Sequence, residues 1–66
     1  MLVTVKSRVG QKSGCEMFLA DAVEVRDGRV VLSSGAGHSL ASIAIGSVQN
    51  AKWIDEENLE IVLKSA

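Results

Sequence analysis

The stretch VEVRDGRVVL at residues 23–32 constrains the fold more than any other part of the chain. Asp27 and Gly28 supply the two positive-φ positions of a type I′ turn, and this turn matches the right-handed twist of the flanking strands. With these two residues as the loop, Arg26 pairs with Arg29, and the pairing continues inward along both strands. The apolar positions then share one face: Val23, Val25, Val30 and Leu32. The sequence therefore predicts a tight antiparallel hairpin with one apolar face.

Three other segments read as strands. Residues 2–8 alternate between apolar and polar side chains, which is typical of a half-buried strand, and the glycines at 9–14 indicate a loop. Residues 16–26 read as one longer strand whose two halves place apolar groups on opposite faces, so we expect a bulge or bend near Ala20–Ala22. Residues 33–39 are expected to form a loop, and residues 40–48 a strand with Gly46 near its end.

The C-terminal stretch KWIDEENLEIVLKS supports two structures. As a hairpin, Asp55 opens a three-residue loop with Asn58 in the left-handed position, which pairs Trp53 with Ile61. Its apolar face would consist of Ala51, Trp53, Leu59, Ile61 and Leu63. As a helix over residues 56–65, Asp55 is the N-cap and the leucines form part of a stripe. The alternation of the apolar residues and the β-branched Ile61 favour the hairpin.

These elements predict an all-β fold in a single domain, residues 1–66. About five short strands would form a small barrel or a strongly twisted antiparallel sheet, and the helix over 56–65 would make the chain α+β instead. In strand number, strand length and the long bent second strand, the plan resembles SH3-like and Sm-like small barrels. The Sm-like comparison would imply a ring of subunits joined edge to edge and bound to RNA. The chain contains no motif of either family, so no functional residue follows from the resemblance.

The size of the chain favours self-association. A chain of 66 residues buries only about 60% of the surface that it exposes when unfolded, so its core is small. Cys15 is the only cysteine, which excludes an intrachain disulfide, and Cys15 with His38 cannot provide the four ligands of a structural zinc site. Disulfides, metals and partner subunits are the usual additions that stabilise a small domain, and of these only partner subunits remain. We therefore expect a homo-oligomer, with another protein as the alternative partner.

Composition argues against several classes of protein. The net charge is −1, and no segment has the pattern of a secretory signal or of a membrane span, so we expect a cytoplasmic protein with no membrane partner. The glycine loop SSGAGHS has Leu40 where a dinucleotide-binding motif requires its third glycine, so it reads as a connection. Anion binding at Gly35–Ser39 remains an alternative.

No catalytic, metal or cofactor site is expected. Nothing in the sequence places Cys15 beside His38 as a nucleophile and its base. The acidic run Asp55-Glu56-Glu57 lacks the spacing of a calcium loop and reads as a charged turn. We therefore do not expect an enzyme.

The expected function is that of a non-enzymatic binding or assembly module that forms a homo-oligomer through edge strands. The two terminal strands are the predicted edges, with these apolar residues: Val3, Val5, Leu59, Ile61 and Leu63. Lysine in place of Val5 or Ile61 should then dissociate or unfold the assembly. The alternative is a nucleic-acid-binding regulator with a basic patch of Lys6, Arg8, Lys12, Arg26 and Arg29. Only Phe18 and Trp53 are available for base stacking, which makes this second function the weaker prediction.

Overall fold

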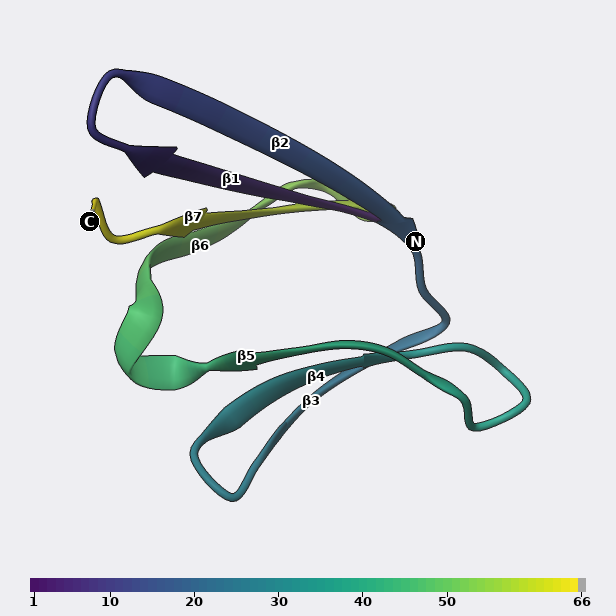
Figure 1. The fold of residues 1–66 in the computed structure, drawn as a ribbon. Helices are drawn as coiled ribbons and strands as arrows, with labels where there is room; N and C mark the ends of the chain where they lie inside the picture. Colours follow the sequence, from purple (N-terminus) through teal and green to yellow (C-terminus); the bar gives the residue numbers. More distant parts are fainter. Residues whose placement is uncertain (66) are drawn as a thin grey trace.

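A computed structural model describes residues 1–65 and shows an all-β domain, which confirms the predicted class (Figure 1). Seven strands and one 3-10 turn follow one another along this part of the chain. They are β1 (Leu2–Val9), β2 (Lys12–Leu19), β3 (Ala22–Arg26), β4 (Arg29–Ser33), β5 (Ser39–Ala44), η1 (Ile45–Ser47), β6 (Val48–Asp55) and β7 (Asn58–Leu63). The one helical element among the described residues is this short turn, and no helix there is long and apolar enough to cross a membrane.

The strands form two sheets that face each other (Figure 1). The larger sheet has the order β2-β1-β7-β6 and the smaller one β3-β4-β5. Every neighbouring pair is antiparallel except β1 and β7, which run parallel in the middle of the larger sheet. The chain passes from one sheet to the other at residues 20–21 and again through η1, and over residues 1–65 the two sheets do not close into a barrel.

The core lies between the two sheets and comes mainly from their central strands. Seven of the described residues are buried: Val3, Val5, Ala20, Val30, Leu32, Leu59 and Ile61. Val3 is paired with Leu59 and Val5 with Ile61 across the parallel ladder, and Leu32 of β4 is fully buried opposite them. We call the face of each sheet that points to the other sheet its inner face. Burial of these small aliphatic groups is the main contribution to stability.

The central hairpin has the predicted turn and register. Asp27 and Gly28 have φ values of 53° and 72°, as a type I′ turn requires. Arg26 pairs with Arg29 and Val23 with Leu32, with no irregularity between them.

The chain has more strands than the sequence predicted, because the expected second strand is divided. The expected bend near residues 20–22 is the corner at which the chain leaves β2 in one sheet and enters β3 in the other. The segment expected to be a loop at 9–14 is reduced to the turn Gly10-Gln11, and β1 and β2 extend to either side of it. Polar residues are tolerated there because both faces of this hairpin end are exposed.

The C-terminal segment is the predicted hairpin and not a helix, but its predicted register is wrong by two residues. Trp53 pairs with Leu59 instead of Ile61. The loop contains two residues, Glu56 and Glu57, instead of three, which shifts the register by one residue, and the irregularity between Trp53 and Asp55 shifts it by one more. Asp55 closes this loop, since its carboxylate accepts hydrogen bonds of 2.8 Å from the Glu57 amide and from the Asn58 side chain.

Two further details of this region differ from the prediction. Trp53, which the sequence predicts on the apolar face of this hairpin, is 55% exposed, because most of β6 lies outside the core. The strand expected at 40–48 ends at Ala44, where η1 turns the chain into the larger sheet.

Candidate functional site

The five basic residues proposed as a nucleic-acid patch do not lie on one surface. Lys6 and Arg8 alternate with the buried Val3 and Val5, so they project from the outer face of the larger sheet. Lys12 is paired with Val9 and lies on the inner side of the same sheet. The two arginines, Arg26 and Arg29, project from the outer face of the smaller sheet. The proposed patch is thus split between opposite faces of the molecule.

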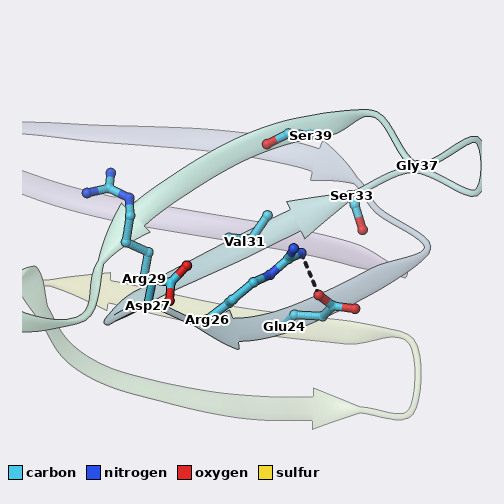
Figure 2. Close-up of a pocket in the computed structure, with 8 residues that line it drawn as sticks. All are labelled: Glu24, Arg26, Asp27, Arg29, Val31, Ser33, Gly37 and Ser39. Atoms are coloured by element: carbon cyan, nitrogen blue, oxygen red, sulfur yellow. Dashed lines mark hydrogen bonds and ion pairs between the residues drawn. The ribbon is translucent and has the colours of Figure 1, made fainter.

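A shallow hollow of about 540 Å³ lies on the outer face of the smaller sheet (Figure 2). Its lining consists of Glu24, Arg26, Asp27, Arg29, Val31, Ser33, Gly37 and Ser39. Arg26 forms an ion pair of 2.8 Å with Glu24, and Arg29 donates to the hydroxyl and the carbonyl oxygen of Ser42 at 2.6 and 3.1 Å. Two guanidinium groups therefore share the hollow with two carboxylates, and the hollow has no excess of positive charge for an anionic ligand.

The glycine loop between β4 and β5 already binds an anion from its own chain. The amide of Gly35 donates to the carboxylate of Asp21, and a side chain at position 35 would collide with that carboxylate. Within the same loop, the amides of Ser34 and Gly37 donate to carbonyl oxygens at 2.9 Å. These three amides are therefore occupied, and they do not form an open phosphate cradle.

A smaller cleft of about 220 Å³ lies between the two sheets. Its lining consists of Val5, Ser7, Glu16, Phe18, Ala41, Ser42, Ile43 and Leu63. β5 therefore lies opposite β1 and β2. Glu16 is the charged member of this mostly apolar lining.

The residues considered for catalysis are on different sheets. Cys15 is exposed on β2 of the larger sheet, and His38 is in the loop between β4 and β5 of the smaller one. Across residues 1–65, no group of three or more histidine, cysteine or acidic side chains is arranged to hold a metal ion.

The strands predicted to be edges, β1 and β7, lie in the interior of the larger sheet, so the prediction that they are free edges is wrong. β1 has β2 and β7 as neighbours, and β7 has β1 and β6. The five residues assigned to the edges contribute to the core or pack against it: Val3, Val5, Leu59, Ile61 and Leu63. The reason is the parallel pairing of the two terminal strands, which gives each of them a partner on both sides.

Within the described part of the chain, the free edges are instead β2 and β6 in the larger sheet and β3 and β5 in the smaller one. β3 has five residues, and the pairing of β5 and of β6 is interrupted by register shifts. β2 has eight residues in unbroken register with β1. Short length and bulges are two of the ways in which natural proteins protect edges, and of these four edges β2 alone has neither of these two.

The hydrogen-bond pattern shows which backbone groups β2 presents at this edge. Met1 and Ala20 exchange two hydrogen bonds, from the Met1 amino group at 2.7 Å and from the Ala20 amide at 2.9 Å. Bonded and non-bonded pairs alternate along an antiparallel ladder, so the even-numbered residues of β2 bond to β1. The odd-numbered residues therefore direct their N–H and C=O groups outward: Ser13, Cys15, Met17 and Leu19.

The outer face of β2 also carries exposed apolar side chains. Met17 is 66% exposed and Leu19 is 79% exposed. Neither residue was predicted to have a role. The sequence did contain an indication of this exposed apolar face, in the run Met17-Phe18-Leu19-Ala20. Successive apolar residues in a strand place apolar groups on both of its faces.

Comparisons with models of protein families, with curated proteins and with solved structures each find no match.

Proposed function

We propose that this protein is a non-enzymatic assembly module that forms a homo-oligomer through the free edge of β2. The observation that carries the proposal is the combination of length, regular pairing and exposed apolar side chains at β2. It has eight residues in regular register, outward-directed backbone groups, and exposed Met17 and Leu19 beside them. A strand with these properties is a template for pairing with another strand.

The size of the core supports the same proposal. The buried side chains of the described residues are all aliphatic, and the largest of them are leucine and isoleucine. Small domains of this kind have a narrow margin of stability, and a partner that binds only the folded state adds to it. Pairing at β2 would satisfy unpaired backbone groups and cover apolar surface in one step.

Proline substitution tests the edge without disturbing the ladder inside the chain. The Cys15 amide points outward, so Cys15→Pro removes a donor that only a partner strand could use. The matched control is Ala51→Pro in β6. The Leu2 amide donates to the Glu57 carbonyl, so the odd-numbered residues of β7 direct their backbone groups to β1 and the even-numbered ones to β6. Ala51 is paired with the odd-numbered Ile61, so it makes no backbone hydrogen bond to β7, and its amide points outward.

Molar mass by light scattering behind a sizing column is the measurement. We expect wild type, Cys15→Ser and Ala51→Pro to form the same oligomer, and Cys15→Pro to elute as a folded monomer, with folding checked by circular dichroism. A monomeric wild type, or an unchanged mass for Cys15→Pro, would contradict the proposal. Adding mixed short RNA and DNA to wild type should leave its mass unchanged, whereas co-elution would favour the nucleic-acid alternative.

A further inference from the structure

We infer that β2 pairs with β2 of a second copy, antiparallel and about a two-fold axis, with Cys15 of one chain opposite Cys15 of the other. This inference rests on the proposed function and adds the identity of the partner strand and the register. It follows from the pattern of outward backbone groups and from the positions of Lys12, Gly14 and Glu16.

The backbone pattern limits the choice of registers. Hydrogen-bonded pairs between the β2 strands of two copies must join residues that direct their backbone N–H and C=O groups outward. On β2 these are the odd-numbered residues. Odd-numbered residues must therefore oppose odd-numbered residues. This arrangement also keeps the outer faces of the two sheets on the same side, as a two-fold axis perpendicular to the sheet requires.

Charge and strand length then select one register. Cys15 opposite Met17 would place Glu16 directly opposite Glu16, and like charges in facing positions are destabilising. With Cys15 opposite Ser13, the paired segment is shorter, because the pairing would run into the Gly10-Gln11 turn. With Met17 opposite Met17, it is also shorter, because the pairing would run past the end of β2. Cys15 opposite Cys15 pairs the whole of residues 12–18 and opposes no two like charges.

The selected register gives the side chains within residues 12–18 compatible neighbours. Glu16 faces Gly14 of the second copy, which has no side chain to compete for space. Lys12 faces Phe18, so its aliphatic stem can cover the ring, and it lies diagonally across from Glu16 at a separation that long side chains can bridge. On the outer face, Met17 faces Ser13. The product is one continuous sheet of eight strands, built from two sheets with four strands each.

Single cysteines at positions 13, 15 and 17 measure the register. Facing residues of a hydrogen-bonded pair have Cα atoms about 5.5 Å apart, which is within the range that a disulfide can bridge. We would use the full chain with wild-type Cys15, and the variants C15S/S13C and C15S/M17C, alone and mixed in pairs. Brief oxidation with diamide, which accepts the two electrons and two protons of the thiols, would be followed by non-reducing gel electrophoresis.

The expected result is a rapid disulfide between two wild-type chains, and a rapid heterodimer when the position 13 and position 17 variants are mixed. Each of those two variants alone should cross-link roughly tenfold more slowly, because its two thiols lie too far apart to be bridged within one dimer. Cross-linking of wild type with the position 17 variant, or of the position 17 variant with itself, at the rapid rate would overturn the register. The C15S/A51C variant on β6 serves as the control for random collision.

Failure of the register and failure of the proposed function give different results. In one outcome, Cys15→Pro abolishes the oligomer but the cysteines cross-link in a combination other than the expected one. This outcome supports the assembly function and refutes the register. An oligomer that shows no rapid link at any of the three positions also refutes it. A wild type that is monomeric by light scattering refutes both.

Discussion

The two edges of the larger sheet, β2 and β6, have the same length and almost the same exposure, but they differ in regularity. Each has eight residues, of which all but one are exposed. β2 follows its neighbour without interruption, whereas the ladder of β6 shifts register at two places, around Gln49 and around Ile54. β6 also carries large apolar groups, since Trp53 and Ile54 are both 55% exposed.

From this difference we propose that regular register, and not exposure alone, makes an edge a binding surface. A bulge places two residues opposite one and bends the strand, so a flat partner cannot bond along its whole length. By this criterion the exposed tryptophan of β6 is a less suitable docking element than the methionine and leucine of β2. Three changes to the sequence test this comparison.

The largest effect is expected from the strand that lies between the two edges. Ile61 of β7 is 1% exposed, and Ile61→Lys would bury an unpaired charge in the core. We expect the loss of about 3 kcal/mol or more, which is a large part of the stability of a chain of this size. Circular dichroism and urea titration should show an unfolded chain, not a folded monomer. The control Ile61→Val should cost about 1 kcal/mol and leave the assembly intact.

An intermediate effect is expected from removal of a bulge in β6. Deletion of Ile54 would place Trp53 and Asp55 in continuous register with β7 and make most of β6 regular. This edge should then pair with other chains as β2 is proposed to do, and light scattering should detect species larger than those of wild type. The control Ile54→Thr retains the bulge and removes only the apolar group. If the deletion variant has the wild-type mass, regularity is not what distinguishes the two edges.

The smallest effect is expected at the turn that joins β6 to β7. The Glu57 amide and then the Asn58 side chain, which donate to the Asp55 carboxylate, hold the pKa of Asp55 below its ordinary value of 3.8. A lowered pKa in the folded state stabilises the fold above pH 3.8, and this contribution is lost as the pH falls through the lowered value. Asp55→Asn should therefore reduce the acid sensitivity of the urea midpoint below about pH 4. Glu56→Gln is the matched control, and an equal change in both variants would contradict the assignment to Asp55.

The two hairpins show how much of the fold could be predicted from the sequence. Asp27-Gly28 determines its own turn, because few dipeptides accept two successive positive φ values, and the register of the flanking strands follows from it. Asp55 can open a loop of either two or three residues, and the choice depends on side-chain hydrogen bonds to Glu57 and Asn58. Local sequence therefore predicted both hairpins but the register of only the first.

The candidate site was less predictable because it depends on contacts between distant residues. Which strands are edges follows from the pairing of Leu2 with Asn58 and of Val5 with Ile61, and no local pattern indicates that pairing. The division of residues 16–26 between two sheets has the same origin, since the corner at Ala20 is fixed by its hydrogen bonds to Met1. Once the edges are known, the alternation of side chains along β2 identifies the exposed surface directly.

The parallel pairing of β1 with β7 also bears on how the chain folds. Its contacts join residues that are far apart in the sequence, so the loop that must close spans most of the chain. Contacts of such high sequence separation slow folding, and during synthesis β1 must wait for β7 to leave the ribosome. Until then β1 has β2 as a partner on one side and an open edge on the other. In the period between synthesis of these two strands, the open edge of β1 can therefore pair with another chain.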